Sequence, residues 1–489
     1  MKKVIISLVS LSFLCFSCAQ STTSPTVLTQ STGGGTANAP TATPTVTSTP
    51  TLVPISSGTP PPIPVNTSLP VPTPSSPTPA GAFPVAFVNN THGAYADNQI
   101  YIFMVGMDAK GEWCWVTKDG VMTPINGTDA NAPGHLSYNG VNYPNYSFTV
   151  ADAGAINVPT FITGGRIYIS LGSPLYIPVS GSGSSNGWVA PNPVSPTDPN
   201  YNTVFDWYEF TYVNVAANPS VAATYPNGVH FGGNTTQVDM FGLPMSVRLI
   251  QKETSYDQSV GIDTTEWTRA QIFAAYEGFV NPAFLSLVLP NKARIVAPGK
   301  ALASGLSGSY STYLDSTISA AWSYYQTHTL NLTGGAVGGQ IYTGSVDPVS
   351  QKFTFYYYAY SGATKQGPFY ISLPSTEDVF AGNGNLATID PATQADGSSP
   401  PDGWIELALE AQFCAALNRG VFTNGSEWST PDLYYPSSTP HNDYAEFWHT
   451  LSGSGLAYGF CYDDVNAQSS VQILPNDDPP DNVIVTIGD

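Results

Sequence analysis

The hydrophobic pattern of the chain changes along its length. Across residues 83–251, short runs of β-branched and aromatic residues are separated by turn residues, a pattern that predicts β-strands. The predicted strands are 85–88, 99–105, 166–171 and 175–178. Segment 112–122 predicts a hairpin, with Asp119 and Gly120 in its two-residue turn. Short strands at this spacing favour a β-sandwich or barrel.

From Thr265 onward, apolar residues recur at helical spacing. The predicted helices are 267–279, 313–325 and 404–419. In the last helix, one apolar stripe is expected to face the core. It consists of Trp404, Leu407, Ala408, Ala411, Cys414 and Ala415. Glu406 and Glu410 fall off this stripe, so we expect both to be solvated.

Strand-like segments return between and after the helices, at 353–360, 455–460 and 483–487. We therefore predict a mainly β fold with an α+β part. The predicted boundaries are 83–251 for the β part, 252–440 for the mixed α/β part, and 441–489 for C-terminal strands that rejoin the first sheets.

The N-terminal end differs in composition from the rest. Residues 1–18 combine a charged start with a short apolar run, which is typical of an export signal and too short for a permanent membrane span. The junction before Cys18 resembles a bacterial lipobox, from which Cys15 and Phe16 depart. We predict an exported lipoprotein anchored through Cys18; a freely secreted protein is the alternative.

Residues 19–82 are rich in Ser, Thr and Pro, and residues 21–82 contain no charged side chain. Such a composition cannot bury a core and favours extended conformers. We predict a disordered linker that ends at residue 82. It acts either as a stalk that reaches insoluble substrate or as a passive spacer.

The overall charge limits the possible partners. The chain has 34 acidic and 14 basic residues, a formal net charge of −20, which disfavours nucleic acid and anionic membrane surfaces. Membrane contact is therefore expected only through a lipid anchor. The 28 tyrosines either stack on sugars or fill β-sheets. Since no Cys and His spacing matches a metal site, we expect no metal and no cofactor.

Three cysteines lie in the predicted folded part: Cys114, Cys414 and Cys461. An exported protein can keep a disulfide, and the predicted pair is Cys414 with Cys461. Three buried free thiols are the alternative.

Two acids carry the candidate chemistry. Glu209 lies among aromatic residues in segment 206–212, and Asp239 lies in an apolar run in segment 237–244. On a strand, Glu209 and Thr211 share the face opposite Tyr208, Phe210 and Tyr212. Two carboxylates on neighbouring strands can cleave a glycosidic bond, one as general acid and one as general base. Asp206 is a weaker alternative acid, and it points to the other face of the strand.

Five segments resemble, in order, motifs of the glycoside hydrolase family 64 β-1,3-glucanases of the laminaripentaose-producing type. They are 164–170, 209–212, 238–244, 413–419 and 458–465. The last also resembles the ending of thaumatin-like proteins, to which that family is related. The resemblance implies a thaumatin-like β-sandwich or barrel domain and a mixed α/β domain flanking a wide acidic cleft. It also implies inverting, endo-type hydrolysis of β-1,3-glucan (laminarin or curdlan) to short oligosaccharides.

The family motifs place the general acid on Glu209 and the general base on Asp239. They imply that Thr211, Asn234 and Thr236 contact sugar. The remaining candidates for substrate contact are Tyr208, Asn442, Tyr444, Asp463 and Asp464; the last two are equally well explained as turn caps. The chain departs from the family in residues 216–232, which we interpret as a loop insertion at a hairpin tip.

A second hypothesis is a non-catalytic, thaumatin-like glucan-binding or adhesion protein. Such a protein could keep the aromatic residues but has no reason to keep both Glu209 and Asp239. In either case the expected partner is β-1,3-glucan, and the expected oligomeric state is a monomer.

Overall fold

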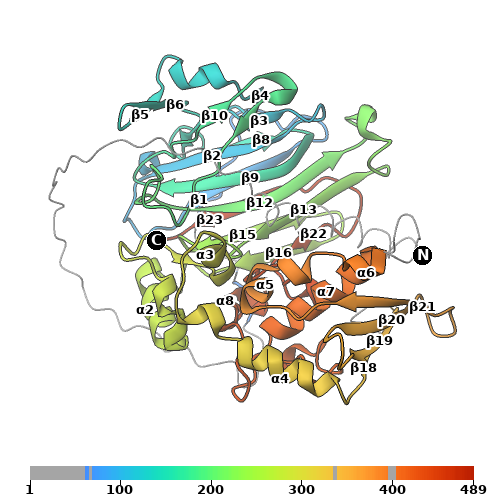
Figure 1. Cartoon of the computed structure of the whole chain (residues 1–489). Helices are drawn as coiled ribbons and strands as arrows, with labels where there is room; N and C mark the ends of the chain where they lie inside the picture. The colour runs from blue at the N-terminus through green and yellow to red at the C-terminus, as the bar shows by residue number, and fades with distance from the viewer. Residues whose placement is uncertain (1–60, 65–68, 334–338, 395–402) are drawn as a thin grey trace.

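The structure is a computed structural model that describes residues 61–64, 69–333, 339–394 and 403–489. The predicted export signal, Cys18 and the first part of the linker lie outside these residues. Figure 1 shows two parts, a β-sandwich and a smaller α/β part packed beneath it. The helices of the described residues include none with the length and apolar character of a membrane span.

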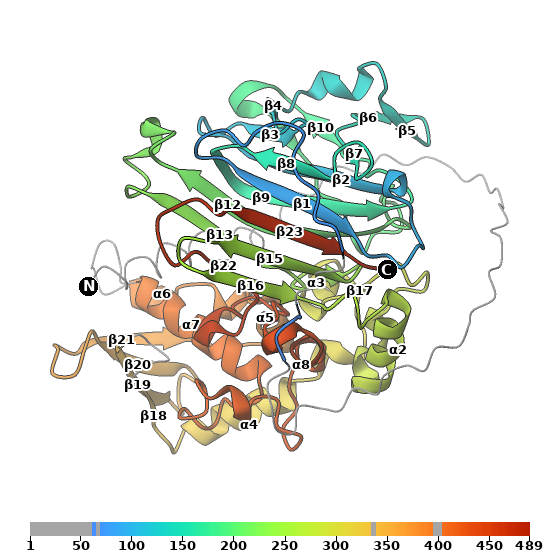
Figure 2. The ribbon, with the colours of Figure 1, turned by 180° about the vertical axis from the view of Figure 1, so that it is seen from behind.

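The first sheet of the sandwich has five strands. In spatial order they are β16 (Tyr256–Gly261), β15 (Met245–Gln251), β23 (Asn482–Ile487), β1 (Phe83–Asn89) and β8 (Ala155–Val158). β23 pairs in parallel with β1 and antiparallel with β15. The C-terminal strand therefore lies inside the sheet, as Figure 2 shows in dark red between its two neighbours.

The second sheet carries the candidate site. Its main path runs β22 (Gln472–Ile473), β13 (Val229–Thr235), β12 (Val204–Asn214), β9 (Phe161–Leu171), β2 (Ile100–Met107), β3 (Trp113–Val116) and β4 (Met122–Pro124), and β7 (Phe148–Thr149) pairs with β2. One buried cluster contains apolar side chains from both sheets, including Tyr208, Phe210 and Tyr212 of β12. Because side chains alternate along a strand, the Glu209 face of β12 points away from this core.

The α/β part is built on a four-stranded antiparallel sheet. Its strands are β18 (Leu330–Thr333), β19 (Ile341–Val346), β20 (Phe353–Tyr358) and β21 (Gln366–Ile371). The helices are α2 (Arg269–Phe279), α3 (Pro298–Ala303), α4 (Asp315–Tyr325), α5 (Thr376–Ala381), α6 (Pro391–Gln394), α7 (Gly403–Asn418) and α8 (Asp443–Leu451). A large aromatic core joins these elements, with Trp322, Phe353 and Phe413 in edge-to-face contact.

Three short strand pairs complete the fold. They are β5 (Leu136–Tyr138) with β6 (Val141–Tyr143), β10 (Val179–Ser180) with β11 (Gly187–Trp188), and β14 (Met240–Phe241) with β17 (Ile295–Val296). The last pair joins the segment after β13 to the start of α3.

The sequence-based prediction for α7 has the right span, but its buried face is right only in the second half, where Ala411, Cys414 and Ala415 are buried as expected. Trp404 and Leu407, expected in the core, are 47% and 38% exposed, whereas Glu406 and Glu410 are buried. The helix is apolar around most of its circumference, so its periodicity does not single out one face. Hydrogen-bond partners determine that Glu406 is buried. It accepts a hydrogen bond from the Asp390 amide, and Asp390 in turn pairs with Lys352.

Two predicted strands are absent. Residues 175–178 are irregular, because the Asn200 side chain bonds both the amide and the carbonyl of Tyr176 and replaces a strand partner. Residues 455–460 are also irregular and follow a short 3₁₀ turn, Gly453–Gly455.

The predicted Cys414–Cys461 disulfide is wrong. Cys414 is a buried free thiol, as is Cys114. The Cys414 thiol donates to the Val379 carbonyl at 3.3 Å.

The predicted linker boundary at residue 82 is too late. Leu69 packs against the apolar outer face of the first sheet. The Asn157 side chain binds both the Thr78 hydroxyl and the Ser76 carbonyl. Tyr212 donates its hydroxyl proton to the Gly81 carbonyl. Proline-rich composition therefore did not prevent this segment from docking, because the folded part supplies its hydrogen-bond partners.

Candidate active site

Glu209 lies in the middle of β12, between cross-strand neighbours. Arg166 of β9 is directly opposite on one side and Asn234 of β13 on the other. The Arg166 Nε is 3.1 Å from the Glu209 Oε1, and the Trp207 indole donates to the same oxygen at 2.9 Å. The Glu209 side chain keeps 12% of its surface exposed. Its carboxylate is therefore fixed by two donors and still open to solvent.

An aromatic cluster covers the same face of the sheet next to Glu209. Tyr168 and Trp207 lie 5.5 Å apart between ring centroids, and Trp113, Trp115 and Trp188 pack partly buried against the cluster. Flat amphipathic rings beside a carboxylate suit contact with sugar rings.

Asp239 approaches from the α/β part. It directly precedes β14, and its carbonyl accepts a hydrogen bond from the Ala297 amide at 3.0 Å. The Lys300 ammonium of α3 is 3.3 Å from the Asp239 Oδ2, and the Asp239 side chain is 24% exposed. The sandwich thus orients one acid and the α/β part orients the other.

Arg166 connects the two acids electrostatically. Burial lowers its pKa, but Tyr168 beside it and the negative charges of Glu209 and Asp239 outweigh burial and raise it overall. Both carboxylates therefore lie within electrostatic reach of one guanidinium. Among the described residues, no group of three or more His, Cys, Asp or Glu side chains is arranged to hold a metal ion.

The residues implied to contact sugar by the family motifs lie beside the two acids. Thr211 is half-buried two positions after Glu209, and its hydroxyl accepts from the Gly164 amide at 3.4 Å. Asn234 is fully buried, and neither atom of its side-chain amide has a hydrogen-bond partner among the described residues. The Thr236 hydroxyl accepts from the Val238 amide.

Four of the other predicted substrate contacts have side chains buried in the protein interior, and their contact with substrate stays a prediction. Tyr208 packs between the two sheets. Asn442 caps α8 and donates to Asn418. The Tyr444 hydroxyl donates to the Gln237 carbonyl at 2.6 Å, so it supports the segment that leads to Asp239. Asp463 forms an ion pair with Arg419 and a hydrogen bond with His449, both at 3.0 Å.

Asp464 is half-buried, and burial raises its pKa to about 6. Its contact with substrate stays a prediction.

Sequence reasoning missed three residues of the site: Trp207, Arg166 and Lys300. The signal for Trp207 was present, since residues two apart on a strand share a face. Arg166 required the register between β9 and β12, and Lys300 required the packing of α3 beside β14. Neither can be read from spacing along the chain.

Comparison with known proteins identifies the family. A family model described as beta-1,3-glucanase, of glycoside hydrolase family 64, matches residues 81–487. A β-1,3-glucanase domain of Clostridium beijerinckii is 32% identical with a TM-score of 0.68, over 85% of this chain and 100% of that one. A laminaripentaose-producing β-1,3-glucanase of Paenibacillus barengoltzii, complexed with laminarihexaose, is 31% identical with a TM-score of 0.61, over 86% of this chain and 76% of that one.

A glucan endo-1,3-beta-glucosidase of Cellulosimicrobium cellulans is 24% identical over 312 residues, which are 63% of this chain and 49% of the relative. The chain thus spans about half the length of the curated relatives that it matches. The family model and the solved structures cover both the sandwich and the α/β part, and the chain therefore belongs to glycoside hydrolase family 64.

Proposed function

We propose that the protein is an endo-acting β-1,3-glucan hydrolase with an inverting mechanism. Glu209 donates a proton to the glycosidic oxygen as the bond from C1 breaks. Asp239 accepts a proton from a water molecule that attacks C1 from the opposite face. The observation that carries this proposal is the pair of partly exposed carboxylates, one on each part of the fold, that share the electrostatic environment of Arg166.

The positions of Glu209 and Asp239 suit two acids that act separately better than one catalytic acid with a structural carboxylate beside it. An inverting enzyme needs about 6.5–9.5 Å between its carboxyl groups to admit a water molecule. Each acid here has its own basic partner, Arg166 for Glu209 and Lys300 for Asp239. Because each acid is oriented by its own ion pair and its side chain keeps some exposed surface, both are available to substrate and water.

The substrate follows from the family and from the aromatic cluster beside Glu209. We propose laminarin- or curdlan-type β-1,3-glucan, with short oligosaccharides as products. Laminaripentaose is the product named for two solved relatives. The predicted insertion, residues 216–232, lies at the tip of the β12–β13 hairpin. Its last residues belong to β13, which begins at Val229. Chromatography of early digestion products tests the product length.

Export and a lipid anchor at Cys18 are also proposals, supported by the charged start, the short apolar run and the lipobox-like junction of residues 1–18. A monomeric state is a further proposal. The relation of the sandwich to thaumatin-like proteins and the wide cleft between the two parts are proposals as well. Labelling with a lipid precursor, in wild type and Cys18→Ala, tests the anchor.

Conservative substitution of each acid tests the chemistry. Glu209→Gln and Asp239→Asn keep the side-chain shape but remove proton transfer, so each should lower reducing-sugar release from laminarin by at least about 100-fold. Binding to insoluble curdlan should persist. NMR should show that the first product has the anomeric configuration opposite to that of the glucan. Binding by the wild-type protein without hydrolysis would instead support the glucan-binding alternative.

A further inference from the structure

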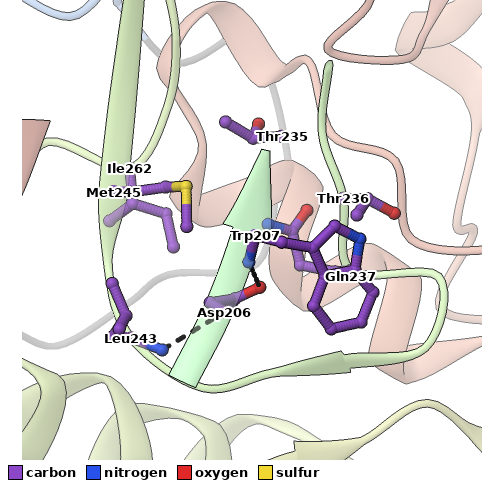
Figure 3. Close-up of a pocket in the computed structure, with 8 residues that line it drawn as sticks. All are labelled: Asp206, Trp207, Thr235, Thr236, Gln237, Leu243, Met245 and Ile262. Carbon is purple, nitrogen blue, oxygen red and sulfur yellow. Dashed lines mark hydrogen bonds between the residues drawn. The ribbon is translucent and has the colours of Figure 1, made fainter. Parts of the chain in front are cut away.

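A buried acid that the proposed mechanism does not use lies three residues before Glu209. Asp206 is 2% exposed on β12. Its Oδ2 accepts hydrogen bonds from the Gly242 amide at 2.8 Å and the Leu243 amide at 3.4 Å, and its Oδ1 accepts from the Trp207 amide at 2.8 Å. Figure 3 shows the carboxylate between β12 and the loop that carries Leu243.

The strand pairing explains why a carboxylate is needed there. β13 pairs with β12 only from Tyr208 onward, so the edge of β12 at Asp206 has no strand partner from β13. The chain at Gly242 packs on this edge instead. A Cβ atom on Gly242 would lie 1.8 Å from the Phe205 carbonyl oxygen, so only glycine permits this approach.

Keeping this carboxylate buried is costly, which argues for a specific role. Burial raises the pKa of Asp206 to about 7, although the amides of Gly242, Trp207 and Leu243 and the charge of Arg294 oppose the rise. A fold keeps a buried carboxyl group of this kind where its hydrogen bonds hold two segments in one arrangement.

The joint links the two segments that carry the proposed catalytic acids. Gly242 lies three residues after Asp239, as Asp206 lies three residues before Glu209. Other hydrogen bonds hold the segment before Gly242. The Tyr444 hydroxyl donates to the Gln237 carbonyl, and the Ala297 amide donates to the Asp239 carbonyl. The Asp206 carboxylate joins this segment by hydrogen bonds to the strand of Glu209 itself, where Met240 and Gly242 also pack.

We propose that Asp206 is a positioning residue that fixes Asp239 relative to Glu209 by holding the backbone of residues 242–243 against β12. The inference rests on the proposed function and adds a residue that touches neither substrate nor water. A misplacement of a reacting group by about 1 Å can cost about 100-fold in rate. The clamp, defined as Asp206 with the Gly242 and Leu243 amides, is therefore expected to control kcat.

The variant Asp206→Asn tests this directly. It keeps the size of the side chain but places an amide NH₂ donor where an oxygen now accepts. We expect kcat on laminarin to fall by about 100-fold with KM changed less than about threefold, because the sugar-binding face near Glu209 is untouched.

Sodium azide separates a misplaced base from general damage. Azide attacks C1 without needing a base, the bond from C1 to the leaving oxygen breaks, and Glu209 protonates that oxygen, giving an inverted glycosyl azide. Azide should therefore raise turnover of Asp206→Asn at least about tenfold, as in Asp239→Ala. Gly242→Ala should respond to azide in the same way, because its Cβ displaces the same segment. It replaces Asp206→Asn in the test if that variant does not fold.

The matched control is Glu410→Gln, which changes another buried acid, on α7 in the α/β part. It should keep wild-type kcat with no response to azide. A folded Asp206→Asn with wild-type kcat, or with a loss that azide does not restore, overturns the clamp. If Asp239→Ala keeps wild-type turnover, the proposed function itself fails, whatever Asp206→Asn does.

Discussion

Each proposed catalytic acid has one basic partner, and the two partners come from distant parts of the chain. Arg166 is 3.1 Å from Glu209 across a strand pair, and Lys300 is 3.3 Å from Asp239 across a helix–strand contact. Each basic partner holds its carboxylate in one orientation, so replacing the two partners one at a time tests the two acids separately.

Arg166→Met removes the guanidinium beside the proposed general acid. Without it, the Glu209 carboxylate keeps only the Trp207 indole as a donor, so its orientation should loosen and kcat on soluble laminarin should fall by roughly 10- to 100-fold. Lys118→Met, at an exposed pair with Asp119, is the matched control and should keep wild-type kcat. An unchanged kcat in Arg166→Met would show that Arg166 does not position Glu209.

Lys300→Met tests the position of the proposed base. The variant removes the ammonium that lies 3.3 Å from the Asp239 Oδ2, so kcat on laminarin should fall, by less than about tenfold because the pair is partly exposed to solvent. Lys292→Met, at an exposed pair with Glu277, is the matched control and should keep wild-type kcat. An unchanged kcat in Lys300→Met would remove Lys300 from this role.

At the level of elements, helix α7 buries two acidic residues, a residue type that normally stays exposed. Glu406 and Glu410 lie one turn apart on its inner face. Burial raises the pKa of Glu406 to about 7, and burial together with the charge of Glu406 raises that of Glu410 to about 9. A carboxyl group whose pKa is raised in the folded state is ionised first in the unfolded chain. Stability therefore falls as pH rises from the unfolded value of about 4.3 toward the folded value.

Glu410→Gln should remove the part of this pH dependence that comes from Glu410. Relative to wild type, the variant should gain stability as pH rises from 5 to 8, by up to about 1.4 kcal/mol per pH unit. The unfolding midpoint in denaturant, measured at each pH, gives the difference. Glu266→Gln, at an exposed position, should show a constant difference. A Glu410→Gln difference that does not change with pH would show that Glu410 is ionised in the fold.

At the level of the whole molecule, the first sheet joins both ends of the folded chain. β23 from the C-terminus pairs with β1, and the segment before β1 docks on the outer face of the same sheet. Further along, the Ser454 amide donates to the Pro61 carbonyl, so the proline-rich segment contacts both parts of the fold.

Truncation separates the docked segment from the rest of the linker. A chain that begins at residue 61 retains the contacts of Leu69, Asn157 and Tyr212. A chain that begins at residue 83 loses these contacts and should melt roughly 5 °C below the first chain. Calorimetry of the two chains measures this difference. Equal Tm values would mean that the docked segment adds no stability.

The sequence alone determined the elements whose pattern is local. The strands near 85, 100 and 166, the hairpin at 112–122 and the spans of α2, α4 and α7 follow from alternation, turn residues and helical periodicity. The turn of that hairpin was predicted wrongly, because Val116 pairs with Met122 and the connection is longer than two residues. The family motifs likewise marked Glu209 and Asp239 without any coordinates. Such signals involve residues close together in the chain, so they survive without knowledge of packing.

Only the tertiary structure decided what depends on partners far along the chain. Strand register placed Arg166 against Glu209, and α3 brought Lys300 to Asp239. The same packing buried Glu410, exposed Trp404 and turned Asp206 from a weak candidate acid into a joint between two segments. The physical reason is that charge, burial and hydrogen bonding are properties of neighbours in space, and a linear pattern does not specify them.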